Sequence, residues 1–531
     1  MRFVYGCLTV VLTAGYLAAQ SVPALPIPVR QVITPALLAT HVSALAHDSL
    51  EGRATGSPGE LKAARYVAGQ FRRLGLCPVD SGPGPDAYFQ PYTIHQRGWG
   101  PVFLRTNRRQ YRLYQDFYVN GLPNAPAPET LPVAFGGYGI DADTYADYTR
   151  LDVRGKAVVL WEGEPRDRVG RYRLSGTDQP SRWSDDAYAW QRKVKAARQR
   201  GARCVLIISS ARRAAFGTEM QRRRVLSQRI NKAGLEPVDE KPGEVAAYVI
   251  SDSLAADVLG VSVRQLTRWQ RQADAQGRSP AQSVASVLTL QSARQDFPLH
   301  TRNVLGWIRG SEHPEEVLVL SAHLDHLGKT AAGVVFNGAD DDASGVAGVL
   351  AIAGAFAEAQ KGGHSPRRSV LFALFSGEET GLWGSQYYVT HPCWSLPQTV
   401  CDLNIDMIGR ADSAHMEGIP SVYTLGSDRL SAELRQVSDE AANQQGGRLT
   451  LDYRFDHDDP QSFFTRSDHY SFARFNVPVI HYFTGLHPDY HQPTDDAERL
   501  CYDRQAIVVQ LILQTAWTVT NKPERIHVDK R

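Results

Sequence analysis

The chain has 531 residues, which is more than one ordinary domain contains and predicts at least two domains. Hydrophobic residues make up 43% of the chain and charged residues 21%, proportions that are ordinary for a folded globular protein. The formal net charge is only +2, so the composition gives no reason to expect nucleic acid or an anionic membrane surface as a partner.

The first 19 residues have the features of a secretory signal peptide. Arg2 supplies a positive charge, residues 4–19 are apolar apart from two threonines, and small residues follow at Ala18 and Ala19. This apolar run is too short and wrongly flanked for a membrane span, and the sequence shows no second apolar stretch long enough to cross a bilayer. We therefore expect a secreted or periplasmic protein without an integral membrane segment after signal cleavage.

The cysteines beyond Cys7 are odd in number, so they cannot all pair within one chain. They are Cys77, Cys204, Cys393, Cys401 and Cys501. Cys393 and Cys401 are close enough in sequence to form a disulfide in an oxidising compartment. The alternative is that all five are free and buried.

Residues 20–128 begin with helical patterns. A helix is expected near residues 35–46, and residues 51–59 form a loop by their glycine and proline content. After this loop, apolar side chains recur at helical spacing up to a stop at Gly75. These side chains are Leu61, Ala64, Val67, Ala68, Phe71 and Leu74.

Residues 129–294 have a different pattern of predicted secondary structure. Short strands are predicted at 133–138, 156–162, 204–209 and 244–250, with Arg-rich helices such as 189–200 between them. This segment contains no dense cluster of histidine, aspartate and glutamate that would indicate chemistry. We interpret it as a smaller, β-rich α/β domain inserted into a larger one.

Residues 295–531 alternate between strands and helices. Apolar runs of strand length occur at 317–320, 369–375, 399–405 and 477–483, and an apolar helical pattern covers 343–358. This alternation predicts an α/β fold with a mostly parallel mixed sheet and helices on both faces. In such sheets the ligand site lies beyond the carboxyl ends of the strands.

A histidine or a carboxylate follows each of these strands or begins the next helix. The candidates are His323, Asp325, Asp341, Glu378, Glu379, Asp406 and His491. Imidazole and carboxylate groups are zinc ligands, and two metal ions can hold a hydroxide and stabilise an oxyanion between them. A carboxylate that binds no metal would take the proton of the attacking water. Asp325 is well placed to accept the ring N–H of His323.

Six short motifs follow one another in this half of the chain. They are Ala-His323-Leu-Asp325-His, Gly-Ala-Asp340-Asp341-Asp342-Ala-Ser-Gly, Ser-Gly-Glu378-Glu379, Asn404-Ile-Asp406-Met, Ser467-Asp468-His469 and Tyr490-His491. In this order they resemble the zinc peptidase family of the bacterial leucyl aminopeptidases, family M28. The loop Leu50–Arg53 looks like the start of the same catalytic domain. The segment 129–294 loosely resembles a protease-associated (PA) domain.

The resemblance implies a role for each candidate residue. It implies two Zn²⁺ ions held by His323, Asp341, Glu379, Asp406 and His491. Asp341 would bridge the two ions, and Glu378 would be the general base. A cis peptide bond is expected between Asp341 and Asp342. For His326, His469 and His487, a structural or supporting role is favoured over direct ligation.

One position departs from the family pattern. Some relatives have a tyrosine three residues before the Ser-Asp-His motif, where its hydroxyl binds the oxyanion. This chain has Phe464 there, which has no hydrogen-bond donor on its side chain. Either zinc alone stabilises the oxyanion, or Arg466, Tyr470 or Tyr482 takes the place of the tyrosine.

The resemblance implies a metallo-aminopeptidase that releases N-terminal residues from peptides. A carboxypeptidase, which needs arginine or lysine to bind a carboxylate, is an alternative on the same site. A one-zinc glutaminyl cyclase and a non-catalytic peptide-binding protein are two others. The sequence lacks the GxSxG motif of serine hydrolases and the HExxH motif of zincins. It gives no indication of the oligomeric state.

Overall fold

The computed structural model describes residues 22–530, except 122, 124, 187, 212, 230–232, 237–245 and 278–280. The predicted signal peptide lies outside the described residues. The chain divides into two compact units: unit 1 comprises Met1–Thr93 and Leu299–Arg531, and unit 2 comprises Ile94–Pro298. Unit 2 begins earlier than the boundary predicted at residue 129, because β2 (Phe89–Arg105) pairs with β10 (Ala233–Gly234) from His95 on. Strand β4 (Phe117–Asn120) also pairs with β11 (Ala247–Ile250) within it.

Unit 1 is an α/β domain with a mixed, mostly parallel sheet, as the sequence predicted. Its strands lie in the order β19-β18-β20-β17-β13-β16-β12. The parallel centre consists of β20 (Val479–Phe483), β17 (Thr399–Ile405), β13 (His313–His323) and β16 (Arg368–Phe375). β18 (Ser421–Leu425) and β12 (Gln282–Ile308) run antiparallel on its two sides. β19 (Thr450–Asp452) pairs with β18, and β1 (Cys77–Pro78) with β12.

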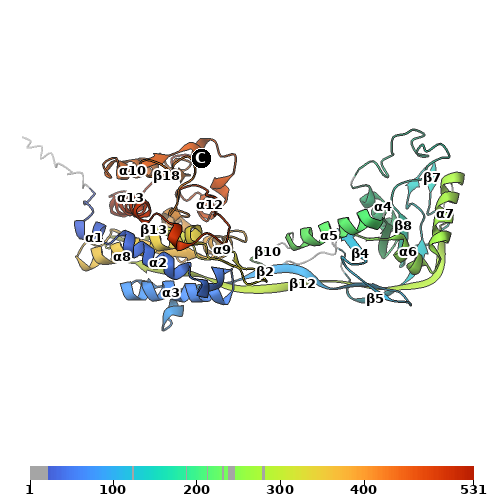
Figure 1. Ribbon diagram of the computed structural model, residues 1–531, viewed down its shortest axis with the longest axis horizontal. Helices are drawn as coiled ribbons and strands as arrows, with labels where there is room; N and C mark the ends of the chain where they lie inside the picture. Colours follow the sequence, from blue (N-terminus) through green and yellow to red (C-terminus); the bar gives the residue numbers. More distant parts are fainter. Residues whose placement is uncertain are drawn as a thin grey trace, which may run out of the picture. The chain divides into compact units, whose positions relative to one another are not determined.

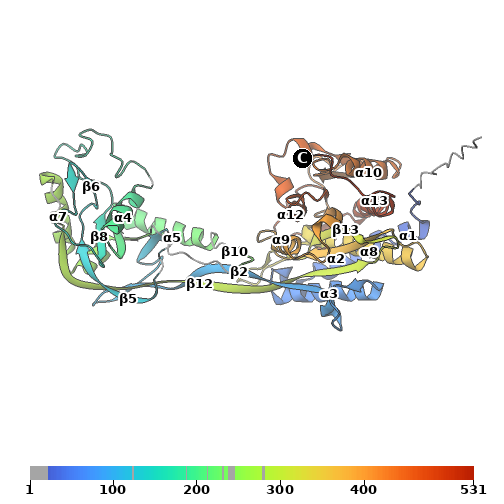
Figure 2. The same ribbon diagram turned by 180° about the vertical axis from the view of Figure 1, so that it is seen from behind.

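Helices cover both faces of this sheet because its central strands are apolar on both faces. In β13, Leu318 and Leu320 belong to one hydrophobic cluster, whereas Val317 and Val319 belong to another. The first cluster contains side chains of α2 (Pro35–Leu45), α3 (Pro58–Leu74), α8 (Gly345–Lys361) and α13 (Tyr502–Asn521). The second contains side chains of α9 (Trp383–Thr390) and α12 (His469–Ala473). Figures 1 and 2 show these helices around the sheet.

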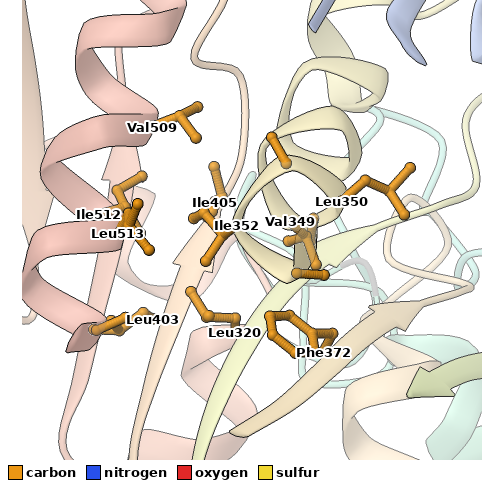
Figure 3. Packing of buried hydrophobic residues seen from close by; sticks show 14 of the residues in the cluster. Leu320, Val349, Leu350, Ile352, Phe372, Leu403, Ile405, Val509, Ile512 and Leu513 are labelled. Carbon is orange, nitrogen blue, oxygen red and sulfur yellow. The ribbon is translucent and has the colours of Figure 1, made fainter. Parts of the chain in front are cut away.

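The first cluster is the main core of unit 1. Figure 3 shows Val349 and Ile352 of α8 and Ile512 of α13 above Leu320 and Phe372 of the sheet. Together with the turn before it, α8 spans Ala339–Lys361, and this helix alone among those described is long and apolar enough to cross a membrane. The apolar segment of this helix is 89% buried inside the fold, as is typical of a core helix. The sequence was expected to contain no second apolar stretch of this length, and by length and composition this helix is one.

Unit 2 has its own sheet and its own hydrophobic cluster. β5 (Ala125–Phe135), β8 (Ala157–Trp161), β9 (Cys204–Ile208) and β11 are parallel, and β12 pairs antiparallel with β5. The cluster includes side chains of α4 (Ala189–Gln199), α6 (Asp252–Leu259) and α7 (Val263–Gln276). These elements agree with the short strands and the helix at 189–200 predicted from the sequence. The likeness to a PA domain stays a prediction.

The remaining elements are short or peripheral. In unit 1 they are α1 (Ile27–Gln31), α10 (Ala432–Asn443), α11 (Arg454–His457), β14 (Gly328–Lys329) and β15 (Val335–Phe336). In unit 2 they are β3 (Gln110–Arg112), β6 (Asp141–Ala142), β7 (Tyr145–Ala146), α5 (Arg213–Arg229) and β10 (Ala233–Gly234). β2 (Phe89–Arg105) begins in unit 1 and continues into unit 2.

The five cysteines beyond Cys7 are all free thiols, so the disulfide considered between Cys393 and Cys401 does not form. Only two of them are buried, which also differs from the alternative that all five are free and buried. Cys204 and Cys401 are buried, whereas Cys77, Cys393 and Cys501 are exposed.

Arg53 holds together the loops that carry the candidate site. The residue is 1% exposed and lies in the loop between α2 and α3. Its guanidinium donates hydrogen bonds to the carbonyl oxygens of Leu45, Leu324, Asn337 and Gly338. Three of these carbonyls belong to the two loops that hold His323 and Asp341. One buried cation therefore fixes the spacing of both loops.

Replacing Arg53 with methionine is expected to destabilise unit 1 by about 3 kcal/mol or more, because four buried carbonyl groups lose their donor. Guanidinium chloride denaturation of the purified full chain measures this change. Arg65→Met is the matched control, since Arg65 is exposed on α3. An Arg53→Met protein as stable as the control would contradict the role assigned to Arg53.

Candidate metal centre

The predicted metal ligands come together at the carboxyl edge of the unit 1 sheet. β13, β16 and β17 are parallel, so the residues that end or follow them reach the same edge. Two groups of side chains lie close enough to hold a metal ion. One consists of His323, Asp341 and Asp406, and the other of His326, Asp341 and Glu379.

The first group is compact. The Nε2 atom of His323 lies 3.0 Å from Oδ1 of Asp341 and 3.7 Å from Oδ1 of Asp406. The other ring nitrogen of His323 donates to the backbone carbonyl of Asp325 at 2.9 Å, which directs Nε2 toward the carboxylates. Ser467 donates to the second oxygen of Asp406 at 2.7 Å and fixes the orientation of that carboxylate.

The second group contains His326 and not the predicted ligand His491, which lies beside it as a second imidazole. The Nε2 atom of His491 lies 3.1 Å from Oδ2 of Asp341 and 3.1 Å from Oε2 of Glu379. The Nδ1 atom of His326 donates to Oε1 of Glu379 at 2.7 Å and lies 3.7 Å from Oδ2 of Asp341. The sequence favoured a structural or supporting role for His326, and the structure places it in direct contact with a predicted ligand.

Asp341 belongs to both groups, and each of its carboxylate oxygens faces a different one. Oδ1 is directed toward His323 and Oδ2 toward His491. The peptide bond between Asp341 and Asp342 is cis, as expected from the family resemblance. The carboxylate of Asp495 accepts hydrogen bonds from the backbone N–H groups of Asp340 and Asp341, at 3.0–3.2 Å, and fixes this segment.

The aspartates on either side of Asp341 have structural roles. Asp342 accepts hydrogen bonds from the backbone N–H groups of His323, Gly345 and Met407, and therefore connects three segments of the site. At Gly345, a Cβ atom would lie 2.2 Å from the carbonyl oxygen of Ile405 and 2.4 Å from Oδ1 of Asp342. Only glycine at this position allows α8 to begin so close to β17.

Asp325 does not bind His323 in the predicted way. Its carboxylate is 4.0 Å from Nδ1 of His323, because the ring N–H donates to the backbone carbonyl of Asp325 instead. The carboxylate of Asp325 accepts hydrogen bonds from the backbone N–H of Glu378 at 3.1 Å and from the hydroxyl of Thr55 at 2.6 Å. Asp325 therefore positions the segment that carries Glu378.

The carboxylates create a strongly negative environment. Loss of hydration and the charges of Glu379, Asp406 and Asp468 raise the pKa of Glu378 well above its usual range. Burial acts to lower the pKa of His491, but Asp341 and Glu379 outweigh it and raise the pKa to about 10. Negative charge therefore exceeds what the imidazoles neutralise, and the site favours cations.

The residues present fit a divalent metal such as zinc. Imidazole nitrogen and carboxylate oxygen are the donors that zinc prefers in catalytic sites. The buried Nε2 atom of His326 has no hydrogen-bond partner among the described residues, and Oδ2 of Asp341 has the ion-pair contact with His491 at 3.1 Å. Asp341 and Glu379 each turn an oxygen toward Nε2 of His491, which is the arrangement expected of ligands around a cation.

A pocket opens in front of these groups. Its wall includes Glu378 and the apolar side chains of Met407, Phe463, Phe483 and Leu486. Phe464 lies elsewhere, beneath the guanidinium of Arg429 at 3.7 Å. Tyr482 is fully buried within the main core, away from the pocket wall.

Arg466 and Tyr490 line the same pocket. Arg466 is one of the residues predicted for the oxyanion, whereas the side chain of Tyr490 was not predicted to belong to the site. Its position directly before His491 was the available indication, and the two rings stack at 3.8 Å. Tyr470, which was also considered, packs against Phe464 and does not belong to the pocket wall.

Comparisons with known proteins find similarity to peptidases. Residues 303–516 match the model of peptidase family M28. The chain is 28% identical over 287 residues to a probable zinc metalloprotease of Leptosphaeria maculans, covering 47% of this chain and 64% of the relative. It is 31% identical over 250 residues to leucine aminopeptidase 2 of Trichophyton equinum, covering 46% of each chain. The alignments thus span about half to two thirds of the relatives' length.

The solved structure of an aminopeptidase from Aneurinibacillus sp. strain AM-1 aligns with 95% of this chain and 98% of its own, at 17% identity and a TM-score of 0.45. The family match covers the segment that supplies the six candidate ligand and base residues His323, Asp341, Glu378, Glu379, Asp406 and His491. Residues 303–516, the larger part of unit 1, therefore resemble the peptidases of family M28.

Proposed function

We propose that this protein is a secreted zinc aminopeptidase with two metal ions at the carboxyl edge of the unit 1 sheet. The observation that carries the proposal is the position of Asp341, whose two oxygens face two separate groups of histidine and carboxylate. A bridging carboxylate between two ligand groups suits a dinuclear centre. Export is part of the proposal and rests on the features of residues 1–19.

The chain's own residues would hold the ions and prepare the reaction. His323 and Asp406 would hold one zinc ion, His491 and Glu379 the other, and Asp341 both. When bound, zinc would supply Lewis acidity beside the scissile carbonyl group.

Glu378 is positioned to move the proton. Glu378 lines the same pocket as His323, Asp341, Glu379 and Asp406, and its backbone N–H donates to Asp325. In the proposed reaction, it takes a proton from the attacking water and gives it to the leaving amine. Its raised pKa suits a group that must accept a proton and then release it.

A free N-terminus suits the hydrogen-bond acceptors of the site. The pocket wall contains four carboxylates, those of Asp341, Glu378, Glu379 and Asp406. Zinc would offset the charge of the three that bind it, whereas Glu378 would keep its charge and accept a hydrogen bond from an ammonium group. An acylated N-terminus lacks this charged donor. The relative from Trichophyton equinum is named leucine aminopeptidase 2, which also supports cleavage at the N-terminus.

Replacement of Glu378 by glutamine is expected to lower kcat for leucyl-p-nitroanilide roughly 100- to 10,000-fold, because the general base is lost while the shape of the side chain is kept. Wild-type activity should be removed by a chelator and restored by zinc. Glu440→Gln, on the exposed side of α10, is the matched control and should retain activity. The same assay compares the hydrolysis of N-blocked peptides with that of peptides that have a free N-terminus.

Two results would contradict the proposal. Cleavage of N-blocked peptides in preference to free ones would change the function to a carboxypeptidase on the same site. Full activity of the Glu378→Gln protein would remove Glu378 from the reaction.

Replacement of His326 by alanine is expected to weaken zinc binding at one of the two positions roughly 10- to 100-fold, because Glu379 loses the donor that orients it. Competition of the metal-free protein with a chromogenic chelator measures both affinities without any turnover. His364→Ala, an exposed histidine, is the control. Two unchanged affinities in His326→Ala would show that the contact does not contribute to binding.

A further inference from the structure

We propose that Arg466 binds the α-carboxylate of a dipeptide, which makes dipeptides the preferred substrates of the site. The inference rests on the proposed aminopeptidase function and adds a substrate class to it. It is carried by the position of Arg466 in the pocket, by the neutral groups that hold its guanidinium, and by the absence of an acidic partner within the described part of the chain.

The guanidinium of Arg466 is held next to the candidate metal ligands. One Nη atom donates to the hydroxyl of Tyr490 at 3.2 Å, and the guanidinium carbon lies 5.2 Å from the ring centre of Phe463. The ring of Tyr490 stacks on that of His491 at 3.8 Å. Tyr490 therefore contacts both Arg466 and His491, which is a candidate zinc ligand.

Arg466 is the only arginine or lysine in the described wall of this pocket. An arginine that served only to neutralise the carboxylates would be expected to pair with one of them. Among the described residues, however, Arg466 has no carboxylate within ion-pair distance, and its one side-chain hydrogen bond goes to a phenol. Most of its five N–H donors remain free for a ligand.

The geometry favours a planar anion as that ligand. Guanidinium groups bind carboxylates through two parallel hydrogen bonds, and contact with an aromatic face orients the plane of the guanidinium in advance. Arg466 is itself exposed, so a ligand reaches it without rearrangement of the core.

The substrate of an aminopeptidase carries its α-carboxylate close to the scissile bond only when it is two residues long. In a longer peptide, the residue after the cleaved bond ends in a neutral amide. The position of Arg466 beside the ligand groups therefore favours a dipeptide, with its ammonium toward the carboxylates and its carboxylate toward Arg466. Stabilisation of the oxyanion is a different role for the same residue, and it would not depend on the carboxylate.

The test compares leucyl-leucine with leucyl-leucine amide, which differ only in the carboxylate. In the zinc-loaded full chain, Arg466→Met is expected to lower the ratio of kcat/KM for the two substrates roughly 10- to 100-fold, mainly through KM, because a charge-assisted contact is lost. Arg466→Lys keeps the charge but not the paired donors and should restore part of the ratio. Arg429→Met, an exposed arginine outside the pocket wall, should retain the wild-type ratio.

Binding gives a second measurement that does not need turnover. Calorimetry on the Glu378→Gln protein, with and without Arg466→Met, compares the Kd values of the same two ligands. An unchanged ratio in both experiments, or an equal loss of kcat on both substrates and on leucyl-p-nitroanilide, would overturn the assignment. A wild type that prefers the dipeptide in binding but shows no chelator-sensitive turnover would contradict the proposed function and leave the Arg466 contact standing.

Discussion

The structure of unit 1 depends on keeping several carboxylates close together in its interior. Asp325, Asp340, Asp342 and Asp468 are all 0% exposed, and Asp341 is 3% exposed. A buried charge costs roughly several kcal/mol unless hydrogen bonds or an opposite charge compensate it. Backbone N–H groups compensate Asp342, and imidazoles lie beside Asp341. The negative charge that remains couples folding of the domain to cations, so metal binding and stability are expected to rise together.

Arg53 has a separate part in this balance. Burial lowers the pKa of its guanidinium, and the charges of Asp341, Asp342, Asp495 and Asp325 offset part of this effect. Its hydrogen bonds nevertheless go to backbone carbonyls, so the carboxylates remain free to face the pocket. A direct ion pair with Asp341 would use an oxygen that the bridging position requires. The hydrogen bonds of Arg53 thus fix the loops and also leave the carboxylates free to bind metal ions.

Much of the fold and of the site could be predicted from the sequence, because both depend on local patterns. The apolar runs 369–375 and 399–405 matched β16 and β17, and the residues that follow parallel strands had to reach one edge. Two features could not be predicted. The contact between His326 and Glu379 depends on how two loops pack, and the start of unit 2 at Ile94 depends on pairing between distant strands. Neither feature produces a periodic pattern in the local sequence from which it could be predicted.

The carboxylates and Arg466 give the pocket two electrostatic poles. The interior pole is formed by carboxylates, of which Glu378 would bind no zinc ion, whereas the positive pole is one exposed side chain that contacts Tyr490 and Phe463. In the proposed complex, a small zwitterion places its ammonium group at the interior pole and its carboxylate at Arg466. A long peptide can satisfy only the interior pole. Selection by substrate length therefore needs no steric barrier, since the separation of the two charges is sufficient.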